Sequence, residues 1–213
     1  MDFLPEDINE YSEKYSQAES DVLAELNRET WSKVLQPRML SGHLQGRVLS
    51  MLSKMIQPKR ILEIGTYTGY AALCMAEGLS EEGKLFTIDK NEELTDMVNR
   101  YVEKANFKNQ IEVLVGNALD VIPTLEEKWD LVFIDADKSN YSNYYDLLID
   151  QMPSGSYLIA DNVLWSGKVT QNYDELDAET QALIDFSKKV HEDERVENVL
   201  FPIRDGLMLI RKK

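Results

Sequence analysis

Apolar and polar positions alternate in regular blocks from residue 60 onward. Short apolar runs predict strands at residues 60–65, 84–89, 111–116, 130–135 and 156–160, and helical patterns follow near 69–79, 92–105, 140–151 and 178–192. The run Leu131–Ile134 is apolar without alternation, which is typical of a parallel strand covered on both faces. The pattern therefore predicts an α/β fold built from right-handed βαβ crossovers.

The last two apolar runs break this rhythm. They span 196–203 and 207–210, and only Arg204, Asp205 and Gly206 separate them. A connector this short cannot carry a crossover helix, so the two runs must form an antiparallel hairpin. The chain thus predicts a seven-stranded, mostly parallel sheet with a C-terminal antiparallel hairpin, which differs from the six parallel strands of a dinucleotide-binding fold.

Residues 1–59 are helical by pattern, with helices expected at 6–14, 20–36 and 41–56 and prolines at Pro5, Pro37 and Pro58. This segment is either a layer that covers the sheet, a cap over the active site or a dimer contact. We find no repeat, low-complexity segment or linker. A chain of 213 residues then fits one domain, with an N-terminal helical cap (1–59) and a core (60–213).

Composition narrows the function. The chain has 38 acidic and 23 basic side chains, a net charge of −15, which disfavours nucleic acid as a partner because phosphate binding depends on Lys and Arg. No run of 18 apolar residues predicts a membrane span, and the acidic N-terminus does not resemble a secretory signal. A single cysteine, Cys74, suits a reducing cytoplasm, where we expect the protein to be located.

The segment 60–70 (RILEIGTYTGY) carries the first candidate site. An apolar strand leads through Glu63 into a turn with Gly65 and Gly69, and nucleotide-like ligands bind beyond the carboxyl ends of such strands. A third glycine is missing, so a pyrophosphate is not expected. Glu63 would repel phosphate and attract a cation or ribose hydroxyls. The turn resembles the first motif of S-adenosylmethionine-dependent methyltransferases, whose cofactor is a nucleoside with a sulfonium and no phosphate.

A second candidate site follows the fourth and fifth strands. Asp135 ends one strand, and Asp161 and Asn162 end the next. Side by side, two carboxylates and an amide oxygen suit Mg²⁺, Mn²⁺ or Ca²⁺, and the lack of thiol or imidazole disfavours zinc. Any one of these residues alone could instead cap a helix. Lys138 lies three positions after Asp135; beside a dication its pKa should fall toward the range of a general base, although an isolated lysine is usually a surface charge.

Together, segments 62–70, 132–138, 161–167 and 202–207 and residue Asp89 resemble the cation-dependent O-methyltransferases. This family contains catechol O-methyltransferase and the plant caffeoyl-CoA O-methyltransferases, and segment 36–46 (QPRMLSGHLQG) is similar to its bacterial members. The resemblance covers residue 36 to the C-terminus. It implies a Rossmann-like class I methyltransferase fold, S-adenosylmethionine as cofactor, a small phenolic substrate and a homodimer, with neither nucleic acid nor membrane as partner.

The resemblance also implies roles for individual residues. Asp135, Asp161 and Asn162 match metal ligands, and Lys138 matches the catalytic base. The matching cofactor-binding residues comprise the acid for the ribose hydroxyls (Asp89), a position beside the adenine (Ala118), one near the methionine moiety (Ser41), and Glu63, Gly65, Thr66, Tyr67 and Asp135. By themselves, Ser41 could be a helix N-cap and Ala118 a packing residue.

The expected reaction is methyl transfer to one oxygen of a vicinal diol on an aromatic ring. Trp165, Tyr141 and Tyr144 are candidates for the substrate wall, although taken singly each is more often a core or cap packing residue. Segment 170–185 contains no Lys or Arg, whereas plant relatives have basic residues there against coenzyme A. A free phenol is therefore favoured over a coenzyme A thioester. The alternative is a nicotinamide-dependent oxidoreductase on a similar sheet, which the incomplete glycine pattern, the hairpin and the oxygen cluster disfavour.

Overall fold

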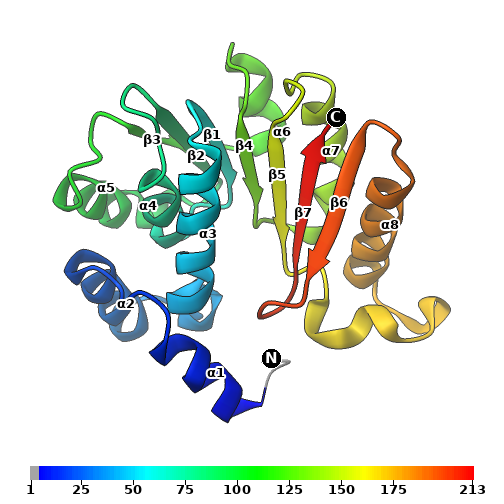
Figure 1. Ribbon diagram of the computed structural model, residues 1–213, viewed down its shortest axis with the longest axis horizontal. Helices are drawn as coiled ribbons and strands as arrows, with labels where there is room; N and C mark the ends of the chain where they lie inside the picture. Colours follow the sequence, from blue (N-terminus) through cyan, green and yellow to red (C-terminus); the bar gives the residue numbers. More distant parts are fainter. Residues whose placement is uncertain (1–4) are drawn as a thin grey trace.

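A seven-stranded sheet runs through the centre of the computed structural model, which describes residues 5–213 (Figure 1). The strands are β1 (Arg60–Ile64), β2 (Lys84–Asp89), β3 (Ile111–Val115), β4 (Leu131–Ile134), β5 (Tyr157–Asp161), β6 (Val196–Phe201) and β7 (Leu207–Lys212). They lie in the order β3-β2-β1-β4-β5-β7-β6. The first five are parallel, whereas β7 pairs antiparallel with both β5 and β6. This confirms the predicted sheet and its terminal hairpin.

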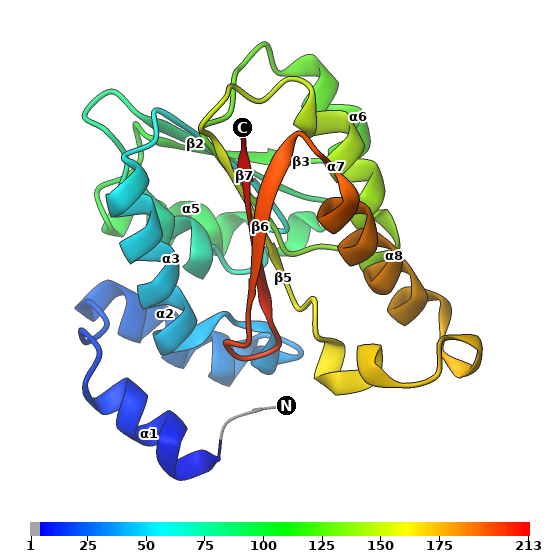
Figure 2. The ribbon, with the colours of Figure 1, turned by 45° about the vertical axis from the view of Figure 1, so that its right-hand side comes forward.

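Helices cover both faces of the sheet, as the apolar strands predict. On β1, Ile61 packs into one core, whereas Leu62 and Ile64 pack into the other. The Ile61 face is covered by α3 (Gly42–Ile56), α4 (Tyr70–Ala76) and α5 (Thr95–Lys104), and the opposite face by α6 (Ala118–Val121), α7 (Tyr141–Ile149) and α8 (Ala178–Glu192). Figure 2 shows the two helical layers on either side of the strands.

The N-terminal segment contributes α1 (Glu6–Lys14) and α2 (Asp21–Lys33) in addition to α3. Leu23 and Leu26 of α2 are buried against the layer of α4 and α5, and α1 lies at the end of the molecule where β4 and β5 finish (Figures 1 and 2). The first four residues of the predicted cap lie outside the described residues. Over residues 5–213, no helix has the length and apolar character that crossing a bilayer requires.

Several predicted boundaries differ from the observed ones. The first strand of the hairpin ends at Phe201 and not at residue 203, because Pro202 has no N–H to donate to the ladder. The helix predicted from residue 92 starts with a 3₁₀ turn at Glu92–Leu94 before α5 begins. The helix predicted to reach residue 36 ends at Lys33, ahead of an extended Val34.

Candidate active site

The turn after β1 is held tightly against the end of β4. Gly65 has φ 102°, a conformation that favours glycine, and a Cβ built on it would lie 1.9 Å from the carbonyl oxygen of Asp135. Tyr67 also has a positive φ (48°), and its N–H donates to Oδ2 of Asp89 over 2.9 Å. This backbone geometry brings the first predicted motif next to the ends of β2 and β4.

A pocket opens beside this turn, at the carboxyl ends of β1, β2 and β3. Its walls include three predicted cofactor-binding residues, Thr66, Tyr67 and Asp89, together with Asn91, Leu94, Thr95, Val98, Val113, Leu114 and Val115. The Asp89 carboxylate also accepts from the N–H of Asn91 (2.9 Å), which fixes its position. A carboxylate among apolar walls suits a nucleoside, because it can accept from ribose hydroxyls while the base contacts the walls. The chemistry of these lining residues therefore matches S-adenosylmethionine, for which the hollow, about 10 Å³ in this structure, has to widen.

Glu63 does not line this pocket. Its side chain is fully buried, Oε2 accepts from the hydroxyl of Thr87, and Oε1 has no hydrogen-bond partner. Burial raises the pKa of Glu63 to about 8, against the lowering effect of the Thr87 bond and with a contribution from the nearby charge of Asp135. In this structure, the acidic side chain exposed to the pocket is that of Asp89.

Two further predicted cofactor residues lie at helix starts. Ser41 occupies the N-cap position of α3 and is buried, but its side chain makes no capping hydrogen bond. Ala118 begins α6 and packs within the core on the α7 side of the sheet. Asn117 caps that short helix, with its side chain accepting from the N–H of Leu119.

The second predicted cluster comes together at the ends of β4 and β5. Nζ of Lys138 donates to Oδ1 of Asp135 (3.1 Å) and to Oδ1 of Asn162 (2.8 Å), so oxygens from both strand ends lie within reach of one nitrogen. Asp161 is buried beside them, with Oδ1 accepting from the N–H of Asn162 (2.7 Å). Its Oδ2 accepts from Nε2 of Gln45 on α3, over 2.5 Å.

The charges in this cluster influence one another. Burial raises the pKa of Asp161, and the nearby negative charge of Asp135 raises it further. Burial alone would lower the pKa of Lys138, but Tyr141, Asp135 and Asp161 outweigh it and raise this pKa above its usual range. From the sequence, a neighbouring dication is predicted to lower the pKa of Lys138. The protein groups alone raise this pKa, so the predicted fall applies only to the protein with a bound dication.

The donor set fits a hard dication. Oxygens of Asp135 and Asn162 lie within reach of one nitrogen, and the carboxylate of Asp161 is buried at the adjacent strand end. Carboxylate and amide oxygens are the ligands that Mg²⁺, Mn²⁺ and Ca²⁺ prefer. Across residues 5–213, no three His, Cys, Asp or Glu side chains gather as a metal-ligand group. If a dication binds here, Asn162 would be its third protein ligand beside Asp135 and Asp161, and water or substrate oxygens would complete the coordination.

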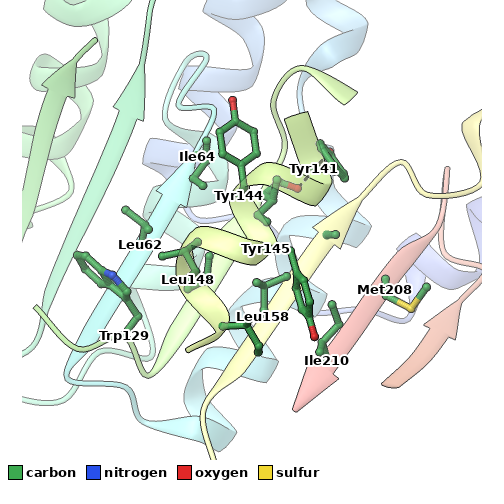
Figure 3. Close-up of a cluster of buried hydrophobic side chains, with 14 of the residues drawn as sticks. Leu62, Ile64, Trp129, Tyr141, Tyr144, Tyr145, Leu148, Leu158, Met208 and Ile210 are labelled. Carbon is green, nitrogen blue, oxygen red and sulfur yellow. Dashed lines mark hydrogen bonds between the residues drawn. The ribbon is translucent and has the colours of Figure 1, made fainter. Parts of the chain in front are cut away.

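Two of the three candidates for the substrate wall are part of the core, which was the alternative role for these tyrosines. Tyr141 and Tyr144 project from α7 into the packed face of the sheet, and both are at most 2% exposed (Figure 3). The Tyr144 hydroxyl donates to Oδ1 of Asp137 (2.6 Å), and the Tyr141 hydroxyl lies beside Lys138. Trp165 remains partly exposed, with its ring 5.7 Å from Nζ of Lys138, as expected of a wall residue.

Sequence reasoning missed two residues that contact the cluster. Gln45 reaches Asp161 across 116 residues of chain, and the Tyr141 hydroxyl accepts a hydrogen bond from Lys138. Gln45 lies in segment 36–46, but that motif gave no reason to place it at Asp161, and Tyr141 was named only as a candidate for the substrate wall. The spacing of Tyr141, three residues after Lys138 in a helical segment, was the one available signal, since residues three apart can meet on a helix.

Known proteins are similar to this chain over most of its length. A family model described as O-methyltransferase matches residues 12–213. A caffeoyl-CoA O-methyltransferase from Petroselinum crispum is 35% identical over 205 residues, which cover 91% of this chain and 85% of the relative.

Solved structures are similar over almost the whole chain. The SAH-bound methyltransferase PaMTH1 of Podospora anserina has a TM-score of 0.90 and 29% identity, covering 99% of this chain and 98% of its own. The O-methyltransferase TomG of Streptomyces achromogenes, in complex with SAM, has a TM-score of 0.88 and 26% identity, covering 97% and 96%. These likenesses identify the fold as that of class I methyltransferases and give no support to a nicotinamide-dependent oxidoreductase.

Proposed function

The chain belongs to the O-methyltransferase family and is an S-adenosylmethionine-dependent enzyme, and from this premise we propose that it methylates one hydroxyl of a vicinal diol on an aromatic ring. We propose further that Asp135, Asp161 and Asn162 bind a divalent cation, with Mg²⁺ as the first candidate. The observation that carries this proposal is the contact of Lys138 Nζ with oxygens of both Asp135 and Asn162, directly beside the buried Asp161.

The protein groups have distinct tasks in this reaction. When bound, a dication supplies a Lewis acid that lowers the pKa of a phenol and orients it, and S-adenosylmethionine supplies the methyl group. Lys138 accepts the proton of the reacting hydroxyl at Nζ. Asp89 accepts hydrogen bonds from the ribose hydroxyls. The partly exposed Trp165 forms one wall of the substrate site, which favours a flat aromatic ring. Holding both reactants in line contributes much of the acceleration.

Electrostatics favour a free phenol over a coenzyme A thioester, although the similar Petroselinum crispum protein is named for caffeoyl-CoA. Asp174 and Glu175 are exposed in the segment between Trp165 and α8. Lys168, in the same segment, forms an ion pair with Asp177 (3.2 Å). The negative charges of Asp174 and Glu175 repel the phosphates of coenzyme A and leave an uncharged catechol unaffected.

A methyl-transfer assay tests the proposal. The protein is incubated with S-adenosylmethionine and catechol, caffeate or caffeoyl-CoA, and with the monohydroxy control phenol, each with added Mg²⁺ or with excess chelator. We expect methylation of the two free diols, less of the thioester, none of phenol, and none in chelator. Undiminished catechol methylation in chelator contradicts the cation, and equal rates for phenol and catechol contradict the diol.

The homodimer implied by the sequence resemblance stays a prediction. Large apolar side chains of the N-terminal segment are exposed, among them Trp31 (61%), Leu35 (88%) and Met55 (74%). Light scattering on the purified protein measures its mass in solution directly. A mass of one chain contradicts the dimer.

A further inference from the structure

Lys138 has three hydrogen-bond partners, and they differ in their relation to the proposed cation. Nζ donates to Asp135 (3.1 Å), Asn162 (2.8 Å) and the hydroxyl oxygen of Tyr141 (2.7 Å). An ammonium group has three N–H donors, so these acceptors match it completely. Two of them are proposed cation ligands, and an oxygen that binds a dication is a poorer acceptor for a second positive group. Tyr141 is the partner that a cation leaves available.

The Tyr141 hydroxyl is oriented to accept from the lysine. It donates its single proton to a main-chain carbonyl at the strand ends, with that of Asp161 at 3.0 Å and that of Ile134 at 3.3 Å. Its oxygen lone pairs are then free to face Lys138. The ring is fully buried and packs edge-on against Phe186, with 5.5 Å between the ring centres, so the hydroxyl has little freedom to turn away.

Resting on the proposed function, we infer that Tyr141 is a positioning residue that holds the Lys138 amine at the acceptor hydroxyl once the cation occupies the other two partners. In the transfer step, the O–H bond of the phenol breaks and its proton moves to Nζ. An electron pair of the oxygen forms the bond to the methyl carbon, and the carbon–sulfur bond breaks with its electrons on sulfur. The ammonium produced is stabilised by donating to the Tyr141 oxygen.

The chain offers a matched pair of variants, Tyr141→Phe and Tyr145→Phe. Both tyrosines lie on α7, both are buried and both rings pack against Phe186, at 5.5 and 6.2 Å. The Tyr145 hydroxyl donates to Oδ2 of Asp193 (2.8 Å), away from the cluster, and in Figure 3 its ring extends toward Ile210. Each variant removes one buried hydroxyl and keeps the ring. Tyr141→Phe loses the hydrogen bond from Lys138, whereas Tyr145→Phe leaves all hydrogen bonds of Lys138 in place.

The readout is the ratio of kcat for catechol to kcat for 4-nitrocatechol, per active site counted by S-adenosylhomocysteine binding. The nitro group strongly acidifies the hydroxyl para to it, so methyl transfer to that oxygen, followed as the 4-nitro-1-methoxy product, depends little on a base. We expect Tyr141→Phe to lower kcat for catechol about 10- to 100-fold, the range for losing a hydrogen bond to a charged group. The loss for 4-nitrocatechol should be much smaller, KM should change little, and Tyr145→Phe should keep the wild-type ratio.

Other outcomes refute the inference. An unchanged ratio in Tyr141→Phe, whether through equal loss for both substrates or through no loss, removes Tyr141 from the positioning of the base. A partly unfolded variant affects both substrates equally, so it cannot imitate the expected result. Failure of the proposed function looks different, since the wild-type enzyme would then fail to methylate catechol or would ignore chelator.

Discussion

The stability of a Glu63→Gln variant relative to the wild type should rise as the pH rises. Glu63 is fully buried on β1, one carboxylate oxygen accepts from Thr87, and the other has no partner. Its pKa in the folded protein is about 8, compared with 4.5 for an unperturbed glutamate. The folded state therefore holds a proton that the unfolded chain has already released at neutral pH, which costs stability.

The size of the effect follows from this shift. Each pKa unit corresponds to about 1.4 kcal/mol, so the wild type loses roughly 3 kcal/mol of unfolding free energy between about pH 5 and about pH 8 through Glu63 alone. Because folding raises the pKa of Glu63, its contribution to the unfolding free energy is complete below the pKa of the unfolded chain. This contribution is lost as the pH rises toward the pKa of the folded protein. Glutamine does not titrate, so its contribution to stability does not change with pH. Its amide group places a buried N–H₂ where Glu63 Oε1 has no partner, which lowers the unfolding free energy by about 1–3 kcal/mol at every pH.

Chemical denaturation of wild type and Glu63→Gln at several pH values measures this difference. The variant should gain relative to wild type by about 3 kcal/mol from about pH 5 to about pH 8. Glu112→Gln on β3, where the side chain is exposed, is the control and should track the wild type. Parallel curves for Glu63→Gln and wild type across this range would refute the assignment of a buried, protonated glutamate.

Three further changes test other parts of the site. Gly65→Ala places a methyl group 1.9 Å from the carbonyl at the end of β4 and should cost at least about 3 kcal/mol of stability, whereas Gly155→Ala, which also has a positive φ (87°) but open space, should cost much less. Equal costs in thermal denaturation would show that backbone conformation, and not contact, dominates. Lys138→Ala should lower kcat for catechol roughly 10²- to 10⁴-fold without abolishing Mn²⁺ binding in calorimetry, and an unchanged kcat would remove it as the base. Gln45→Leu removes a donor to the carboxylate of Asp161 and should weaken Mn²⁺ binding about 10- to 100-fold; unaltered calorimetric affinity would show that this bond does not orient the ligand.

The sheet was predictable because its signals are local. The unbroken apolar run of β4 indicated burial on both faces, and the short connector at Arg204–Gly206 required a hairpin. The ends of elements were less predictable because they depend on hydrogen bonds that a periodic pattern does not contain. Pro202 illustrates this, since it ends β6 although the apolar pattern continues through Ile203.

The candidate site was predictable where topology alone brings residues together. Parallel neighbours β4 and β5 end at the same edge, which places Asp135 beside Asp161 and Asn162. Side-chain direction was not predictable in the same way. For Tyr141 the sequence left both the substrate wall and the core open; it is buried beside Lys138, because its hydroxyl finds acceptors on the main chain at the strand ends.

The central claim is that Asp135, Asp161 and Asn162 together bind a dication at the ends of β4 and β5. The most direct measurement is an anomalous difference map from crystals grown with Mn²⁺ and S-adenosylhomocysteine. The account predicts one strong peak within coordination distance of oxygens from all three side chains, with Lys138 close by. A map with its peak elsewhere, or with no peak between these side chains at saturating Mn²⁺, would contradict it.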